Sequence, residues 1–224
     1  MTTLYVIGTP IGNLEDVTFR AVRILKEVDV ILCEDTRVTK RLLQQYKISK
    51  PTLSFHVRST LSKVEHIFEL LRAGKSLALV TDAGTPGISD PGSLLVSKVR
   101  EALPEVSIIT IPGPSALTSA LSIAGVPTHE FTFLGFLPHK KGRETLFREI
   151  AVAKRTYVFY ESPHRILKTL ESLQKFVPKK RVVIARELTK IYEQTISGTP
   201  SEILKYFIKN PDKVRGEFVV VVTP

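Results

Sequence analysis

The chain has 224 residues, of which 43% are hydrophobic and 24% are charged, as in a folded globular protein of one or two domains. Its net charge of +10 suggests that it binds an anionic partner. No run approaches the ~18 apolar residues that span a bilayer, and the opening MTTLYVIGTP lacks the pattern of a secretory signal. The single cysteine, Cys33, excludes an internal disulfide and a cysteine-based zinc site, and the five histidines show no ligand spacing, so we expect a cytoplasmic protein without a metal.

The first half of the chain alternates short apolar runs with amphipathic windows, which is the pattern of βαβ units. The runs TLYVI, DVILC, TLSF, LALV and VSIITI predict strands, and the windows between them predict helices over about 17–28, 37–46 and 59–72. A further helix is predicted with Asp90 as its N-cap and Pro91 at its first position. Strands joined by crossover helices predict a parallel sheet.

The pattern changes after Ile111, where the turn PGPSA leads into a helix of small residues over 115–124. We place a domain boundary here, between residues 1–112 and 113–224. The second half predicts strands at FTFLGF, TYVFY, RVVIAR, YEQTIS and EFVVVV. It also predicts a helix capped by Ser162, with Pro163 after the cap, and a helix after Thr199-Pro200. RVVIAR and YEQTIS follow each other without a helix, which predicts a mixed sheet. The fold class is therefore α/β, with a mainly parallel first domain and a mixed α+β second domain.

Basic residues are unevenly distributed. Residues 1–112 carry 14 Lys/Arg and 12 Asp/Glu, a net charge of +2, whereas residues 113–224 carry 18 and 10, a net charge of +8. The window 36–64 contains seven basic residues and no acidic one. This window and the segment PHKKGR predict an RNA-facing surface that comprises Arg37, Lys40, Arg41, Lys47, Lys50, Arg58, Lys140, Lys141 and Arg143. From charge alone, a solvated helix face explains the window equally well.

Glycine, proline and aspartate gather just past the predicted strands, in GTPIGN, EDTR, TDAGTPGISD and IPGPSA. In an open parallel sheet, ligands bind at the carboxyl ends of the strands, so these loops predict a ligand site. Neither G-x-G-x-x-G after the first strand nor the P-loop pattern G-x-x-x-x-G-K-[ST] is present. Loops of this composition suit a ligand without phosphates, such as S-adenosylmethionine.

Six motifs together resemble the tetrapyrrole-methylase-like (class III) methyltransferases: GTPIGNLEDVTFRA, CEDTR, VTDAGTPGISDPG, IPGPSA, FYESPHR and ARELTKIYEQ. The likeness runs from Leu4 to the terminal GEFVVVV. It implies two α/β domains with S-adenosylmethionine in the cleft between them, and a homodimer. Within the family, the motifs resemble most the members that methylate a cytidine 2′-hydroxyl in small-subunit (16S) ribosomal RNA, which implies ribosomal RNA or the small ribosomal subunit as partner.

The same resemblance implies cofactor contacts from both halves of the chain. By position, it carries them over to Pro10, Ile11, Gly12, Asp82, Ala83, Gly84, Thr85, Ser115, Ala116, Tyr160, Glu161, Leu188, Thr189, Gly216, Glu217 and Phe218.

Methyl transfer to an oxygen requires aligned donor and acceptor and removal of the hydroxyl proton. The candidates for a base, or for a cation beside the developing alkoxide, are Glu34, Asp35 and Arg37 in EDTR and Arg186 and Glu187 in ARELT. An Arg–carboxylate network that ties loops together is an equal alternative for these residues. Two other functions stay open, namely a methyltransferase for a tetrapyrrole or other small substrate and an RNA-binding protein without catalysis. The second of these leaves VTDAGTPGISDPG unexplained.

Overall fold

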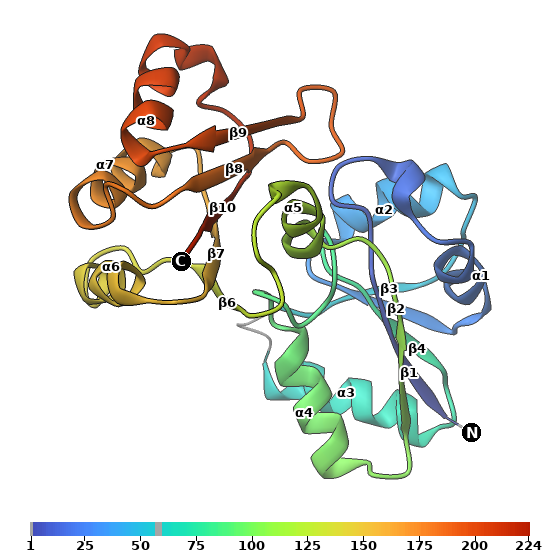
Figure 1. The fold of residues 1–224 in the computed structure, drawn as a ribbon. Helices are drawn as coiled ribbons and strands as arrows, with labels where there is room; N and C mark the ends of the chain where they lie inside the picture. The colour runs from blue at the N-terminus through green and yellow to red at the C-terminus, as the bar shows by residue number, and fades with distance from the viewer. Residues whose placement is uncertain (1, 57–59) are drawn as a thin grey trace. The chain divides into compact units, whose positions relative to one another are not determined.

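The chain forms two compact units in a computed structural model that describes residues 2–56 and 60–224. Unit 1 is Met1–Ser115 and unit 2 is Ala116–Pro224, so the division falls shortly after the predicted boundary (Figure 1). Among the described residues, no helix has the length and apolar character needed to cross a membrane.

Unit 1 is built on a parallel sheet with the strand order β3-β2-β4-β1-β5. Its strands are β1 (Thr3–Ile7), β2 (Val30–Cys33), β3 (Thr52–Ser54), β4 (Leu77–Leu79) and β5 (Ser107–Ile111), and its helices are η1 (Leu14–Asp16), α1 (Phe19–Glu27), α2 (Thr36–Gln45), α3 (Leu61–Arg72) and α4 (Gly92–Ala102). The predicted parallel sheet is confirmed.

Both faces of this sheet are covered, because alternate side chains of each strand point to opposite faces. Leu32 packs in a cluster with residues of α3 and α4, whereas its neighbour Ile31 packs in a second cluster with residues of α1 and α2. Figure 1 shows the two pairs of helices on the two sides of the sheet. Because the strands are all parallel, their carboxyl ends lie at one edge of the sheet, and the loops that follow them lie there too.

The start of α4 differs from the prediction. The helix begins at Gly92 with Pro91 in the N-cap position, one residue later than expected. The Asp90 carboxylate accepts hydrogen bonds from the Gly92 amide at 2.7 Å and from the Gly87 amide at 2.8 Å, so it is held by the preceding loop as well as by the helix.

Unit 2 contains a mixed sheet with the strand order β6-β7-β10-β8-β9. Its strands are β6 (Phe131–Phe136), β7 (Thr156–Glu161), β8 (Val182–Arg186), β9 (Gln194–Gly198) and β10 (Phe218–Val222), and its helices are α5 (Ala116–Ala124), α6 (Arg143–Val152), α7 (Ile166–Phe176), α8 (Pro200–Lys209) and η2 (Pro211–Lys213). β10 is antiparallel to both β7 and β8, and β8 is antiparallel to β9. The predicted mixed sheet is confirmed.

The core of unit 2 forms where α6, α7 and α8 pack on the sheet, around Phe147, Leu170, Phe207 and Val220. The other face contacts α5, which packs against β10 and β8. Since β7 and β8 are both antiparallel to β10, they run in the same direction and end at the same edge of the sheet.

Two helix starts in unit 2 test the capping signals. α8 begins at Pro200, within one residue of the predicted start after Thr199-Pro200, and has a capping box between Thr199 and Glu202. α7 begins only at Ile166, because the Ser162 carbonyl accepts hydrogen bonds from the amides of both Arg165 and Ile166 and a turn forms first. The predicted start directly after Ser162 is therefore wrong by about one turn.

Candidate functional site

The loops that follow β1, β4 and β5 are hydrogen-bonded to one another. Thr9 and Gly84 pair through their backbones, with the Thr9 amide 2.9 Å from the Gly84 carbonyl and the Gly84 amide 3.1 Å from the Thr9 carbonyl. The Thr9 hydroxyl donates to the Thr81 carbonyl at 3.0 Å, and the Thr85 hydroxyl donates to the Pro114 carbonyl at 3.3 Å. These loops therefore form one connected surface at the carboxyl edge of the sheet.

Two glycines are required where the first and last of these loops meet. A Cβ at Gly8 would lie 2.8 Å from the Gly113 Cα, and a Cβ at Gly113 would lie 2.8 Å from the Gly8 carbonyl oxygen. Both distances are too short for any side chain, so the glycines of GTP and PGP allow the two backbones to touch. Gly84, with φ +85°, lies in the left-handed region that glycine adopts most readily.

The cofactor residues predicted in unit 1 lie on or beside this surface. Pro10, Ile11 and Gly84 are buried, Asp82, Thr85 and Ser115 are half-buried, and Gly12 and Ala83 are exposed. A Cβ at Gly84 would lie 3.4 Å from Ile11 Cγ2, so the first loop and the DAGTP loop contact each other. The structure brings these two predicted segments together, and their contact with a cofactor remains a prediction.

Asp35 and Arg37 of EDTR are paired with each other. Asp35 caps α2 by accepting from the Arg37 amide at 2.8 Å, and the Arg37 guanidinium lies 2.6 Å from the same carboxylate. These hydrogen bonds lower the pKa of Asp35 to about 2. The Asp35 amide in turn donates to Asp82 Oδ1 at 3.0 Å, which links the loop after β2 to the loop after β4. A carboxyl with so low a pKa is a weak base.

Glu34, directly after β2, has the opposite electrostatics. Burial raises the pKa of Glu34, and the nearby carboxylates of Asp82 and Asp90 raise it further. Burial also raises the pKa of Asp82, although the hydrogen bond from the Asp35 amide opposes the shift. A raised pKa makes a carboxylate a stronger proton acceptor, so Glu34 is the better suited of the EDTR carboxylates to act as a base. Within the described part of the chain, no group of His, Cys, Asp and Glu could hold a metal ion.

In unit 2, Arg186 of the ARELT segment acts as a clamp on the backbone. It is 7% exposed, and its guanidinium donates to the Arg215 carbonyl at 3.1 Å and to the Tyr192 carbonyl at 3.3 Å. The loop after β8 is thereby tied to the segment that precedes β10. Arg186 thus ties loops together, as the alternative role predicts, but through backbone carbonyls and not through a carboxylate.

Glu187 is also engaged within unit 2. Its carboxylate accepts from Lys190 Nζ at 2.9 Å and from the Glu217 amide at 3.1 Å. Burial opposes ionisation, but these hydrogen bonds outweigh it and lower the pKa of Glu187. A Cβ at Gly216, which has φ +82°, would collide with the Glu187 carboxyl group. Glu187 is therefore a poorer candidate for the base than Glu34.

Thr189 lies in the same loop with φ +66°, a strained conformation for a β-branched residue. Its amide donates to Glu193 at 2.6 Å, but its hydroxyl is buried and has no hydrogen-bond partner among the described residues. An unsatisfied buried hydroxyl is a group that a bound ligand can satisfy. Of the other predicted cofactor residues here, Leu188 and Phe218 are buried, Ala116, Tyr160 and Gly216 are half-buried, and Glu217 is exposed.

Glu161, at the end of β7, is held by contacts from four residues of unit 2. Its carboxylate accepts from the Thr169 hydroxyl at 2.6 Å and from the Ser162 amide at 2.9 Å, and it lies 3.2 Å from Arg165 Nε. Arg143 Nη2 lies 3.7 Å from the carboxylate and donates to the Thr169 hydroxyl at 2.6 Å. Glu161 is 1% exposed, so its carboxylate is committed to this internal network.

The network corrects the expectation for Arg143. Its side chain is only 12% exposed and faces Glu161, so it does not belong to an open RNA-facing surface. Glu161 and Arg165 are four residues apart in the sequence, a spacing that is typical of an ion pair on a helix. Nothing in the sequence indicates that Thr169 or Arg143 also contacts Glu161. The two arginines also donate to the carbonyls of Leu137 and Pro138, and so they hold the start of the PHKKGR segment.

The remaining predicted RNA-facing residues lie in two places. On and just after α2, Arg37, Lys40, Arg41 and Lys47 are exposed and Lys50 is half-buried. Between β6 and α6, Lys140 and Lys141 are exposed. Arg58 lies outside the described residues.

Unit 1 is a parallel βα unit with a connected loop surface at its carboxyl edge, and unit 2 is built on a mixed sheet. The chain belongs to the Tetrapyrrole (Corrin/Porphyrin) Methylases, because residues 3–204 match that family, which comprises S-adenosylmethionine-dependent methyltransferases.

Its particular relatives include proteins named Ribosomal RNA small subunit methyltransferase I. The protein from Thermotoga maritima is 47% identical over 224 residues, covering 100% of this chain and 99% of the relative. The protein from Synechocystis sp. is 46% identical and covers 99% of this chain and 79% of the relative.

Solved structures share the fold at lower identity. The methyltransferase CobJ matches with a TM-score of 0.71 and 22% identity, over 100% of this chain and 94% of that one. Uroporphyrin-III C-methyl transferase from Thermus thermophilus, complexed with S-adenosylhomocysteine, matches with a TM-score of 0.66 and 18% identity, over 99% of this chain and 97% of that one. The α/β fold class is confirmed.

Proposed function

We propose that the chain transfers a methyl group from S-adenosylmethionine to the ribose 2′-hydroxyl of a cytidine in small-subunit (16S) ribosomal RNA. The observation that carries this proposal is the full-length similarity, at 47% identity, to a protein named as a small-subunit ribosomal RNA methyltransferase. The choice of a cytidine 2′-hydroxyl rests on the motif resemblance alone. A tetrapyrrole substrate has weaker support, because the solved structures whose names point to one are 18–20% identical and carry only the fold.

The loop surface of unit 1 suits the proposed cofactor. Asp82 offers a half-buried carboxylate, of which Oδ1 accepts from the Asp35 amide, and such an acceptor suits an ammonium group or a ribose hydroxyl. Ile11 and Gly84, which contact each other beside Asp82, would pack against the ligand. When bound, S-adenosylmethionine supplies the electrophilic methyl group.

Two tasks then fall to the protein. Alignment of donor and acceptor contributes up to ~7–11 kcal/mol when geometry is fixed beforehand. Removal of the hydroxyl proton adds roughly 10²–10⁴-fold in rate, and we assign it to Glu34 because burial and neighbouring carboxylates raise its pKa. Arg37, which forms an ion pair with Asp35, would contact RNA.

A substrate with one altered sugar tests the proposal. Small-subunit ribosomal RNA carrying a single 2′-deoxycytidine at the target should still bind, because phosphate contacts survive, but it should accept no methyl group. The target is first located by mass spectrometry of ribosomal RNA from cells with and without the protein. Methyl transfer to the deoxy substrate would show that a base is modified and would reject the 2′-hydroxyl. The predicted homodimer stays a separate prediction, to be tested by analytical ultracentrifugation.

A further inference from the structure

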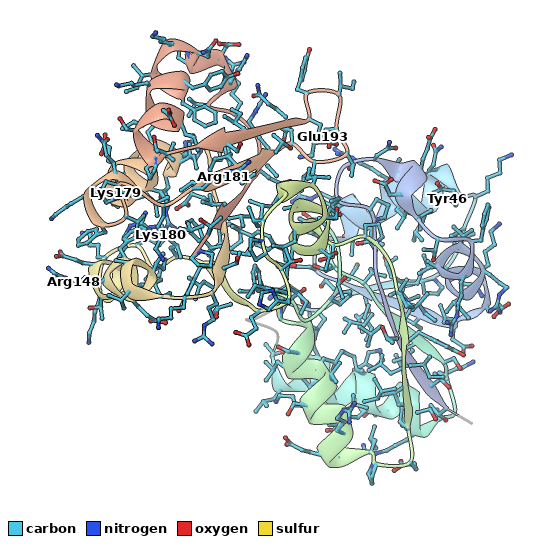
Figure 2. The ribbon with its side chains drawn as sticks, viewed as in Figure 1. Tyr46, Arg148, Lys179, Lys180, Arg181 and Glu193 are labelled. Atoms are coloured by element: carbon cyan, nitrogen blue, oxygen red, sulfur yellow. The ribbon has the colours of Figure 1, made fainter. Side chains whose placement is uncertain are left out.

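A second concentration of positive charge lies in unit 2, in two segments that run from the ends of α6 and α7 into β7 and β8. The segments 150–157 and 172–182 contain no acidic residue. They hold Lys154, Arg155, Lys175, Lys179, Lys180 and Arg181. Figure 2 labels Lys179, Lys180 and Arg181, which lie near one another and near Arg148 of α6.

The two loops are fixed against each other by Lys180. Its ammonium donates to the carbonyls of Ile150 and Ala153, at 2.9 and 2.8 Å, at the carboxyl end of α6. A cation at this end of a helix satisfies carbonyls that have no partner within the helix and interacts favourably with its dipole. Phe147 of α6 stacks on Phe176 of α7 with ring centroids 6.0 Å apart, so the helices that carry the loops are packed together as well.

The remaining cations of these two segments are open to solvent, including Lys175 in the last turn of α7. Lys154, Arg155, Lys175, Lys179 and Arg181 are exposed. Over residues 2–56 and 60–224, Lys154, Lys175 and Lys179 form no ion pair, unlike Arg23 with Glu27 or Arg72 with Glu65. We call the five exposed residues Lys154, Arg155, Lys175, Lys179 and Arg181 the α6–α7 basic surface.

This surface lies at the opposite edge of the sheet from the predicted site residues of unit 2. β7 runs from Thr156 to Glu161 and β8 from Val182 to Arg186 in the same direction, so the basic loops meet the strand starts and the site residues meet the strand ends. At about 3.3 Å per residue, the two edges are roughly 15 Å apart. A small substrate cannot reach both edges, whereas an extended polyanion can.

We propose that the α6–α7 basic surface binds the phosphate backbone of the RNA substrate at a distance from the methylated nucleotide. The inference rests on the proposed function, which supplies RNA as the substrate. Phosphate contacts of this kind position a nucleic acid without reading its sequence. Lys180 serves as the internal anchor that holds the two loops in place, and the exposed cations make the contacts.

The test removes three charges while keeping the side-chain stems. The variant Lys154→Gln/Lys175→Gln/Lys179→Gln is compared with a control that removes the same charge elsewhere, Lys26→Gln/Arg100→Gln/Lys209→Gln. The affinity for small-subunit ribosomal RNA is measured over a series of salt concentrations. Each lost phosphate contact reduces the slope of log K against log salt by roughly 0.7–0.9, so we expect a slope shallower by about 2–3 in the first variant and unchanged in the control.

The outcomes separate this inference from the proposed function. If the wild-type slope of log K against log salt is steep but changes equally in both variants, only net charge matters, and the proposed role of the α6–α7 basic surface is wrong. If the wild-type protein does not bind the RNA, or binds it without salt dependence, both the proposed RNA substrate and the proposed role of the α6–α7 basic surface are wrong. Urea unfolding followed by tyrosine fluorescence, which reports mainly on unit 2, checks that this unit stays folded in the first variant. Unchanged affinity for S-adenosylmethionine shows that the loss is confined to RNA.

Discussion

Replacement of Glu161 with Gln tests whether its buried carboxylate holds unit 2 together. The side chain is fully buried, and it faces Arg165 at 3.2 Å and Arg143 at 3.7 Å. Gln keeps the shape and one acceptor oxygen but removes the charge, which leaves two largely buried guanidinium groups poorly compensated. Removal of one partner from a buried ion pair costs about 3–5 kcal/mol, and because Gln retains an acceptor, we expect about 3 kcal/mol for Glu161→Gln.

The assay is urea unfolding followed by tyrosine fluorescence. The chain has no tryptophan, and unit 2 holds Tyr157, Tyr160, Tyr192 and Tyr206, so the signal reports mainly on that unit. Glu144→Gln is the matched control, because Glu144 pairs with Arg148 on an exposed helix face, where ion pairs often contribute nothing measurable. If Glu161→Gln unfolds at the wild-type urea concentration, or if the control loses as much, the network does not stabilise unit 2.

Three further predictions concern unit 1. Asp82→Ala should weaken S-adenosylmethionine binding by roughly 1–3 kcal/mol in calorimetric titration, and a folded variant with wild-type affinity would contradict the assignment. Glu34→Gln should lower the single-turnover rate roughly 10²-fold. Because the folded-state pKa of Glu34 lies above its usual value, ionisation of Glu34 at neutral pH destabilises the folded state. The Glu34→Gln variant should therefore unfold at a higher urea concentration than the wild type at neutral pH. Wild-type turnover should fall as the pH drops through the raised pKa of Glu34, because the base becomes protonated. Gly8→Ala should cost about 1–3 kcal/mol in urea unfolding through its collision with Gly113, and a variant that unfolds at the wild-type urea concentration would contradict the close approach.

The strands could be predicted from the sequence because they are short runs of apolar, β-branched and aromatic residues, which favour strands even where, as in β6, no residue is fully buried. TLYVI and FTFLGF match β1 and β6 residue for residue. Strand order could not be predicted, since nothing in the period of a run shows that β1 lies between β4 and β5. The start of α7 was misjudged for a related reason, because a helix-start signal at Ser162-Pro163 does not reveal the turn that the Ser162 carbonyl closes first.

The candidate site was predictable as a set of loops but not as a set of contacts. Glycine and proline place the loops after the strands, whereas the approach of Gly8 to Gly113 joins residues far apart in the chain. Residue type also does not show whether a basic side chain is exposed to solvent or paired with a buried carboxylate. Lys141 and Arg143 belong to one basic segment, yet the first is exposed and the second is turned inward to Glu161.

The position of β10 in its sheet bears on how the chain folds during synthesis. Unit 1 can complete its sheet once β5 has been made, because β1 then has both of its neighbours, β4 and β5. Unit 2 must wait until residue 222, since β10 is the strand that joins β7 to β8. We therefore expect unit 1 to fold first, while the edges of β7 and β8 stay unpaired and able to pair with other chains. Loss of β10 should accordingly leave a protein whose first unit is folded and whose second unit aggregates.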